Sequence, residues 1–425
     1  MLAFHTGASR ATGASPKGEA TGGAPGASLG LHGPPTAVAA SDPSLRFELI
    51  ADLDSLERLL PAWRTLHEQS DRAEPMQSPD WLLRWWRIYA PGSDRALRVA
   101  IWRLGERLVG LAPLCRRTCW YRGFLPFRRL EFLGSDVDEN DGVCSEYLGL
   151  LAAPGLETGV ASALVDQAAR GGLGPWDEIV LSPFAGDDAQ WGRLACHFRD
   201  RDFRVQEQET TTAPYVTLPR SWDDFLQGLS KSKRWNLKTQ LKDFDAWAAG
   251  RTAWHEAATE EELERGRAIL AALHEERWRE DGRAGAFAAP RFAAFHDEHM
   301  RFLLKAGRLE LLWLTVGGRP VAALYAFRAA GKVAFYQSGR ATDLPEKVRV
   351  GSVIVAHAIR RAIERGDREF DFLGGPARYK LAFTTTTRPL FSLRIARPDM
   401  KEAVRRAAET VVAAARQLRA CLRRA

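Results

Sequence analysis

The chain has 425 residues, of which 45% are hydrophobic and 27% charged, and its formal net charge is +7. This length and composition are typical of a soluble globular chain of two to three domains, and the basic balance favours anionic partners without specifying one. A small disulfide-stapled module, a membrane channel and a fully disordered protein are excluded, because the five cysteines are dispersed and no apolar run approaches the roughly 20 residues of a membrane-spanning helix. Since no secretory signal is visible, we expect a cytoplasmic protein with reduced thiols.

Residues 1–44 differ in composition from the rest of the chain. Gly, Ala, Pro, Ser and Thr occupy 32 of these 44 positions. Such a segment buries too little apolar surface to offset the entropy lost on ordering. We therefore predict a disordered tail.

Residues 45–218 are predicted to form a first lobe with two helices, a hairpin, a third strand, a helix and a closing strand. The first helix ends near Leu66-His67-Glu68, and the second opens at Ser78-Pro79, where proline suits the first helical turn. The later elements are expected at Arg98–Arg103, Leu108–Leu114, Arg129–Leu133, Leu156–Arg170 and Glu178–Leu181.

Residues 219–250 are predicted to form a connecting helix over about Ser221–Trp247. Four cations fall on one of its faces, opposite a leucine-rich face: Lys231, Arg234, Lys238 and Lys242. A solvated helix face is one interpretation of this stripe, and a binding face for an anionic substrate or cofactor tail is the other. Trp235 would add a stacking surface in the second case.

Residues 251–397 repeat the plan of the first lobe. A helix carries Leu273-His274-Glu275, and the next opens at Ala289-Pro290. The later elements are expected at Leu309–Thr315, Pro320–Phe327, Lys332–Tyr336, Ser352–Arg365 and Glu369–Leu373. Two residues, Gly317-Gly318, join the hairpin strands, which must then be antiparallel.

The predicted fold is α/β of the α+β kind, with two tandem lobes whose sheets are mixed and largely antiparallel. The order of elements is not the strict alternation of a doubly wound sheet. The sequence separation between matching elements of the two lobes varies along the chain, as expected of a diverged duplication with changed loops. Residues 398–425 follow as a predicted amphipathic basic helix, which either packs on its own domain or contacts a partner or a membrane surface.

One strand–helix junction has the features of a phosphate-binding site. The segment Lys347–Ser352 contains Lys347, Arg349, Val350, Gly351 and Ser352, with Ser352 the expected helix N-cap. Free backbone N–H groups, the helix dipole and two cations favour a bound anion there. The matching segment of the first lobe, Ala153–Glu157, has no cation and carries a carboxylate, so we predict a single site, in the second lobe.

The closing strand of the second lobe also carries candidate catalytic groups. Asp371 lies between phenylalanines, a Gly374-Gly375 turn follows, and Tyr379 and Lys380 come next. The first lobe has no comparable residues at its closing strand. An aspartate in this setting must be hydrogen-bonded or shifted in pKa, and bracing the turn is the structural alternative. The His-Glu pairs and the His296/His299 pair lack a further ligand at metal spacing, so no metal is predicted.

These stretches resemble the double GNAT-fold acetyltransferase-like family that includes the cellulose-biosynthesis protein CelD, related to the FemABX peptidoglycan aminoacyltransferases. The resemblance covers about residues 46–397 and is carried by four stretches: Ser230–Leu237, Gly317–Ala323, Arg349–Ser352, and Phe370–Gly375 with Tyr379-Lys380. It implies two GNAT-like lobes and transfer of an acyl group from acetyl-CoA or another acyl-CoA. The acceptor would be an amine or hydroxyl of a small molecule, glycan or peptide, in cellulose, exopolysaccharide or cell-envelope biosynthesis.

The resemblance also implies roles for particular residues. Donor phosphates would lie at Lys347–Ser352, and Lys380 would stabilise the oxyanion. Asp371 is the candidate base or orienting group, and Tyr379 the candidate proton donor. Gln337 and Ser338 would line the acceptor cleft, while Lys231, Arg234 and Lys238 would contact an anionic substrate. Two alternatives stay open: an aminoacyl-tRNA-dependent transferase, and a non-catalytic scaffold of a polysaccharide synthase.

Overall fold

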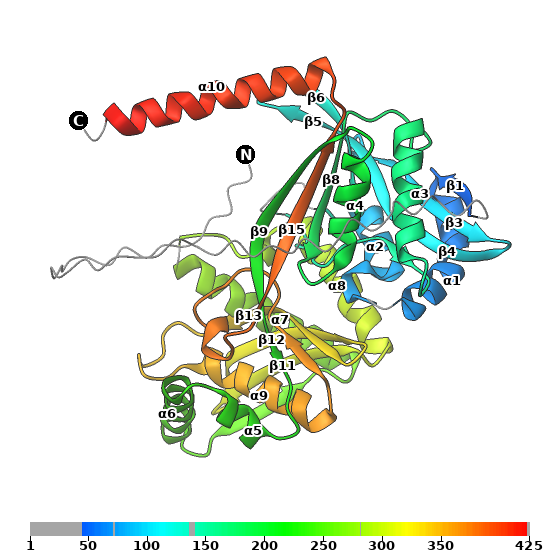
Figure 1. Ribbon diagram of the computed structural model, residues 1–425. Coiled ribbons are helices and arrows are strands. Elements are labelled where there is room, and N and C mark those ends of the chain that lie inside the picture. Colours follow the sequence, from blue (N-terminus) through cyan, green and yellow to red (C-terminus); the bar gives the residue numbers. More distant parts are fainter. Residues whose placement is uncertain (1–44, 71–72, 136–140, 281, 423–425) are drawn as a thin grey trace. The chain divides into compact units, whose positions relative to one another are not determined.

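A computed structural model describes residues 45–70, 73–135, 141–280 and 282–422 (Figure 1). The predicted tail of residues 1–44 lies outside these ranges. Among the described residues, no helix is at once long enough and apolar enough to cross a bilayer.

The first lobe contains the predicted elements in the predicted order, together with others that were not predicted. Its elements are β1 (Arg46–Ile50), α1 (Leu53–Gln69), η1 (Pro75–Gln77), α2 (Pro79–Tyr89), β2 (Ala96–Leu97), β3 (Val99–Leu104), β4 (Arg107–Ala112), β5 (Leu114–Tyr121), β6 (Leu125–Phe132), β7 (Leu151–Ala152), α3 (Glu157–Arg170), β8 (Glu178–Ala185) and α4 (Ala189–Arg199). Proline opens α2 as predicted, and the Ser78 side chain caps it by accepting from Trp81 N–H. The elements that were not predicted include β1, β2, β7 and α4, and the long β5–β6 hairpin stands where the sequence analysis predicted only a short third strand.

The second lobe repeats this order. Its elements, with those that flank it, are β9 (Arg204–Thr217), α5 (Trp222–Gly228), α6 (Lys231–Ala248), β10 (Thr252–Glu256), α7 (Glu260–Glu280), η2 (Ala286–Ala288), α8 (Pro290–Lys305), β11 (Leu309–Val316), β12 (Arg319–Ala329), β13 (Lys332–Arg340), α9 (Val350–Arg365), β14 (Glu369–Asp371), η3 (Lys380–Ala382), β15 (Thr387–Ala396) and α10 (Met400–Leu422). The mixed α/β fold with two similarly built lobes is thereby confirmed.

The prediction of a single connecting helix over Ser221–Trp247 is wrong, because two helices span this segment. Leu229 and Ser230 have extended backbone, so α5 ends at Gly228 and α6 begins at Lys231. The Ser230 side chain accepts a hydrogen bond from Lys233 N–H and caps the new helix. A serine that competes for backbone hydrogen bonds favours such a break over an uninterrupted helix.

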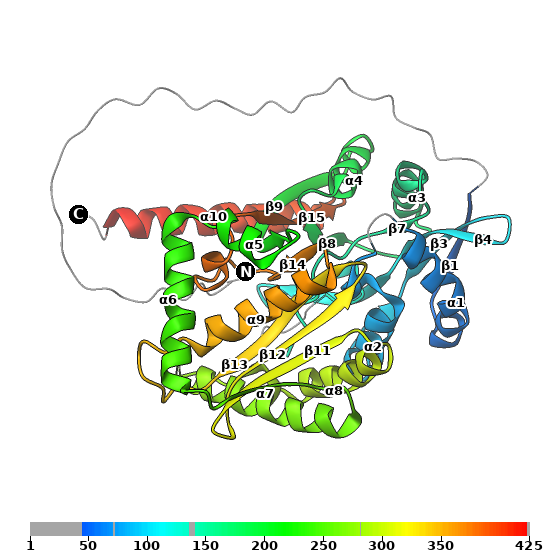
Figure 2. The same cartoon turned by 90° about the horizontal axis from the view of Figure 1, so that it is seen from below.

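One eleven-stranded sheet runs through both lobes, in the order β10-β11-β12-β13-β14-β9-β15-β8-β6-β5-β2, and a four-stranded sheet β1-β3-β4-β7 completes the first lobe. Two pairs, β13/β14 and β6/β8, are parallel, and the other pairs are antiparallel. Strands β9 and β15 lie side by side along their whole length and connect the lobes (Figure 1). In the second lobe, β11–β13 lie between α7 and α9 (Figure 2).

Buried contacts also connect the two lobes. The Lys332 ammonium lies 2.9 and 3.0 Å from the two carboxylate oxygens of Glu74. Trp81 of α2 packs edge-on against Phe295 and His299 of α8, at centroid distances of 4.7 and 4.8 Å. The two histidines considered for a metal, His296 and His299, thus belong to this aromatic interface.

Candidate active site

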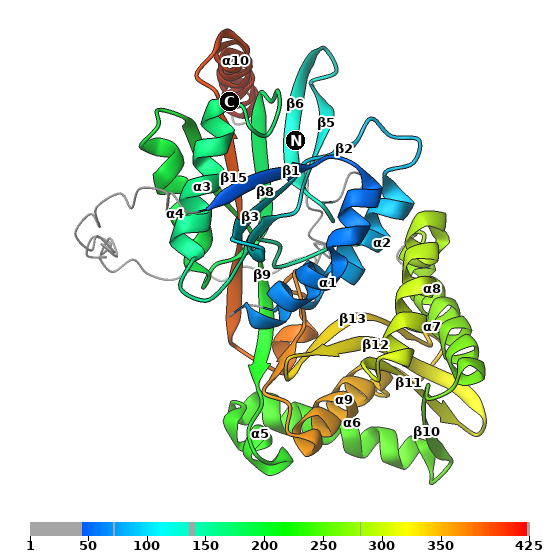
Figure 3. The ribbon, with the colours of Figure 1, turned by 90° about the vertical axis from the view of Figure 1, so that its right-hand side faces the viewer.

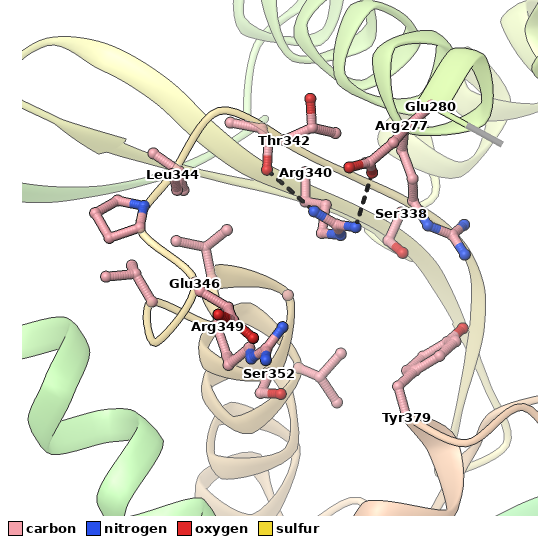
Figure 4. Close-up of a pocket in the computed structure, with 17 residues that line it drawn as sticks. Arg277, Glu280, Ser338, Arg340, Thr342, Leu344, Glu346, Arg349, Ser352 and Tyr379 are labelled. Atoms are coloured by element: carbon pink, nitrogen blue, oxygen red, sulfur yellow. Dashed lines mark hydrogen bonds and ion pairs between the residues drawn. The ribbon is translucent and has the colours of Figure 1, made fainter. Parts of the chain in front are cut away.

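A cavity of about 500 Å³ lies between the end of β13, the loop after it, the start of α9 and the last turns of α7 (Figure 4). It opens where two parallel strands part. Strands β13 and β14 pair only over Lys332–Ala334 and Glu369–Asp371. Beyond that pairing, a bulge on β13 at Tyr336 shifts the register with β12. The strands then diverge and leave space for a ligand.

The cavity wall carries three arginines. Arg340 forms an ion pair with Glu280, at 3.2 Å between Nη2 and Oε2. Arg277 and Arg349 have no carboxylate within ion-pair distance among the described residues, and their guanidinium groups remain available to an anion. The first turn of α9 leaves the N–H groups of Val350 and Gly351 without an intrahelical acceptor, which adds donors on the same wall.

Helix α7 is held tightly against the cavity end of β13. A Cβ atom on Gly339 would lie 2.5 Å from the backbone nitrogen of His274, so only glycine permits this close approach. His274 Nε2 accepts from Ala286 N–H, so Nδ1 carries the proton and donates to Ser338 O at 3.0 Å. Burial lowers the pKa of His274, which keeps the ring neutral. Both ring nitrogens of His274 thus have hydrogen-bond partners, and with Glu275, which accepts from Gly285 N–H, the ring braces the site.

Tyr379 closes the cavity from the segment that follows β14. About 39% of its surface is exposed, and it lines the same wall as Ser338 and Arg277. Partial removal from water raises the pKa of Tyr379 to about 12, against a lowering effect of Arg277. The phenol is protonated at neutral pH and can donate a hydrogen bond into the cavity.

Asp371 lies outside the cavity wall. Its carboxylate is fully buried, accepts from Leu373 N–H at 2.8 Å, and lies 3.3 Å from the Arg388 guanidinium. Burial raises the pKa of Asp371 to about 6, against lowering effects of Lys332 and the Leu373 N–H. This geometry is that of a residue that braces the turn after β14, the structural alternative considered for Asp371 in the sequence analysis.

Lys380 is also buried, and it braces the same turn. Its ammonium donates to Leu373 O at 3.1 Å and to Gly374 O at 2.7 Å. Glu146, from the first lobe, accepts from Gly374 N–H at 2.7 Å. Burial lowers the pKa of Lys380, against the attraction of Glu146 and Asp371. Leu373 has φ of +58°, a strained value for leucine that these contacts maintain.

The structure brings together six of the residues proposed from the sequence: Ser338, Arg349, Val350, Gly351, Ser352 and Tyr379 line the cavity. Seven others do not line it: Asp371, Lys380, Lys347, Gln337, Lys231, Arg234 and Lys238. Ser352 lies within the first turn of α9, and the N-cap residue is Arg349, so the predicted cap is wrong by three residues.

Several wall residues were missed from the sequence, among them Arg277, Glu280, Arg340 and Thr342. Arg340 and Thr342 end and follow β13, and their nearness to the predicted phosphate segment was a usable signal. Arg277 and Glu280 come from α7, some 70 residues earlier in the chain, and nothing local marks them.

The first lobe offers no equivalent anion site at its α3 junction. The Glu157 carboxylate accepts from Gly155 N–H at 3.0 Å and thus occupies the start of that helix itself. Val160 also packs closely on β4, where a Cβ on Gly110 would lie 2.6 Å from its side chain. The start of α3 is therefore less suited to an anion than the start of α9, and a single site in the second lobe stays a prediction.

Comparisons with known proteins agree with this geometry. Residues 231–381 match the family model of the Acetyltransferase (GNAT) domain, and all wall residues of the cavity lie within that range. No curated protein matches the chain in sequence.

The fold is that of solved structures with little sequence similarity. The crystal structure of FemX is 10% identical with a TM-score of 0.55, over 81% of this chain and 96% of FemX. A conserved protein of unknown function from Bacteroides thetaiotaomicron VPI-5482 is 12% identical with a TM-score of 0.51, over 82% and 100% of the two chains. A tandem GNAT protein from the clavulanic acid biosynthesis pathway is 12% identical with a TM-score of 0.40, over 84% and 99%.

Proposed function

We propose that the second lobe transfers an acyl group from an acyl-CoA, held in the cavity between β13 and α9, to an amine or hydroxyl acceptor. The observation that carries the proposal is the position of the cavity. It opens at the parting of two parallel strands and at a helix N-terminus, inside the stretch that matches the GNAT acetyltransferase domain.

The cavity wall supplies the groups that a thioester donor with phosphates requires. Arg349, Arg277 and the free N–H groups of α9 would bind the phosphates, since guanidinium groups and helix N-termini are strong phosphate ligands. The volume of about 500 Å³ suits a pantetheine arm and a small acyl group better than the whole nucleotide, which would extend towards solvent past Arg349.

The reaction would proceed by attack of the acceptor on the thioester carbonyl. A bond forms between the acceptor nitrogen or oxygen and the carbonyl carbon, the carbon–sulfur bond breaks, and the acceptor proton ends on solvent or a base. Tyr379 is the proposed donor of a proton to the departing thiolate, because it is protonated and lies on the wall. Asp371 and Lys380 act as positioning residues that hold the Leu373–Gly375 turn.

Acyl-CoA binding tests the donor site. Arg349→Glu places a negative charge beside the phosphates and should weaken acetyl-CoA binding by about ten- to a hundred-fold in calorimetry. Gly351→Leu should also weaken binding, because the leucine side chain would occupy space in the cavity. The fold should tolerate this change, since a Cβ atom on Gly351 meets nothing closer than Arg340 at 3.7 Å and leucine favours helix. Lys305→Glu, an exposed charge reversal at the end of α8, is the matched control and should bind normally.

Tyr379→Phe tests the catalytic role separately. We expect unchanged acyl-CoA affinity and a kcat lower by about a hundred-fold, measured as free thiol release with an accepted amine or alcohol. Wild-type kcat in this variant would remove Tyr379 from the mechanism. An absence of any acyl-CoA binding by the wild-type chain would favour the non-catalytic scaffold instead.

A second candidate, transfer from aminoacyl-tRNA, is favoured by the surface of α6. Trp235 is 66% exposed there, and Lys231, Lys238 and Lys242 are exposed on the same helix. If tRNA is the donor, reversing the charge of these three lysines should weaken tRNA binding and reduce the dependence of the remaining affinity on salt. Acyl-CoA binding should stay unchanged. The acceptor class, the envelope or exopolysaccharide pathway and the cytoplasmic location remain predictions.

A further inference from the structure

The tip of the β5–β6 hairpin exposes two large aromatic side chains. Trp120 is 62% exposed and Phe124 is 59% exposed, on either side of the turn at Arg122-Gly123. Large apolar side chains on a monomer surface are ordinarily scattered, and a pair on a protruding hairpin marks a surface that contacts something.

The same hairpin is cationic. Residues 116–130 include five arginines and no carboxylate. Three of these arginines are held by carboxylates further along the chain, namely Glu131, Asp177 and Glu178. Arg122, in the turn, and Arg116, further back on β5, have no ion pair among the described residues. The tip therefore presents aromatic rings together with uncompensated positive charge.

Helix α10 lies beside this hairpin (Figure 3). The Arg405 guanidinium is 5.9 Å from the centre of the Tyr121 ring, and the Lys401 ammonium is 5.6 Å from the centre of the Phe127 ring. Residues 400–425 carry seven basic and two acidic side chains. Among the described side chains of α10, the exposed large apolar ones are Met400, Val404 and Val411. The helix alone lacks aromatic anchors, and the neighbouring hairpin supplies them.

We propose that the hairpin tip and α10 together form a docking surface for an anionic lipid bilayer. Trp120 and Phe124 would enter the headgroup region, and the exposed Arg122 of the hairpin and Arg406 of α10 would lie among the lipid phosphates. A nucleic acid fits less well, since the exposed aliphatic side chains of α10 offer nothing on which bases stack. The inference does not depend on the proposed acyl transfer.

Vesicle co-sedimentation of the full chain tests the proposal. The wild-type chain should bind vesicles of phosphatidylcholine with roughly a quarter phosphatidylglycerol, and binding should fall steeply with added salt. The Trp120→Ala/Phe124→Ala variant should bind about a hundred-fold more weakly, because two rings lose their burial in the interface. Arg116→Glu/Arg122→Glu should lose the preference for anionic over neutral vesicles.

Trp235→Ala is the matched control, because Trp235 is equally exposed but lies on α6. It should bind vesicles like the wild type. Unchanged thermal melting of all variants, expected for exposed positions, separates lost docking from lost folding. The proposal is overturned if the wild type ignores anionic vesicles, if the double alanine variant binds normally, or if RNA alone is bound through the tip.

Discussion

Asp371 shows at the scale of one residue how burial changes a proton equilibrium. Its carboxylate is fully buried, and its pKa is raised to about 6 from the usual 3.8. The folded chain thus holds this proton over a range where the unfolded chain releases it. Stability should fall as the pH rises from about 4 to 6, by on the order of 3 kcal/mol.

Asp371→Asn should remove this pH dependence. The asparagine oxygen can still accept from Leu373 N–H, and Arg388 keeps its ion pair with Glu369 at 3.0 Å. Urea unfolding at several pH values should show that the free energy of unfolding of the variant rises relative to that of the wild type between pH 4 and 6. Asp223→Asn, on the exposed start of α5, is the control. Parallel profiles for wild type and Asp371→Asn would show that Asp371 is ionised in the folded protein.

At the scale of one element, a buried ion cluster anchors the start of α10. Glu402 is 3% exposed and lies 2.8 Å from Arg394 of β15 and 2.7 Å from Arg405 of its own helix. Burial would raise the pKa of Glu402, but hydrogen bonds from these two arginines outweigh it and lower the pKa to about 2. The stabilisation is complete above about pH 4.5 and is lost as the pH falls towards 2.

Glu402→Gln should therefore loosen α10 without unfolding the rest of the chain. Arg394 would keep Glu178 and Arg405 would keep Glu409, so the expected cost is that of weakened charged hydrogen bonds, about 1.5–3 kcal/mol. Hydrogen exchange of the α10 amides should speed up by about ten- to a hundred-fold, while the strands of the sheet keep their protection. Glu409→Gln, which removes a half-exposed partner of Arg405, should have a much smaller effect.

At the scale of the whole molecule, the two lobes share one sheet and one of the two hydrophobic clusters formed by the described residues. Strands β9 and β15 belong to both lobes, and one hydrophobic cluster includes Trp81 of the first lobe and Phe295 of the second. Since neither lobe can lose its structure without exposing the other, we expect residues 45–422 to unfold in a single cooperative transition.

Lys332→Met tests this coupling. Glu74 is nearly buried, and the substitution removes its ammonium partner. The free energy of unfolding should fall by about 3–5 kcal/mol. Adding Glu74→Gln should recover part of the loss, because the uncompensated charge is removed. Near- and far-ultraviolet circular dichroism should give coincident urea transitions in all variants. Separate transitions for the two probes would show independent lobes.

Local sequence determined the order of elements, since it depends on contacts within a few residues. Proline in the first turn of α2 and α8, glycine after α3 and α9, and alternating apolar strands act over one helical turn or one strand pair. They were enough to predict two similar lobes, and they led to the proposal of an anion-binding segment at Lys347–Ser352. They also distinguished the two lobes, because the carboxylate of Glu157 lies at the start of the matching helix in the first lobe.

Only the tertiary structure decided which side chains share a space. Arg277 reaches the cavity because Gly339 lets α7 approach β13, and Asp371 and Lys380 turn away from it because Glu146 and Arg388 arrive from distant elements. The placement of Tyr121 and Phe127 beside α10 likewise depends on the pairing of β5 with β6. Several of these contacts join residues far apart in the chain, 228 positions for Glu146 and Gly374, and their energies depend on packing and charge that no local pattern contains.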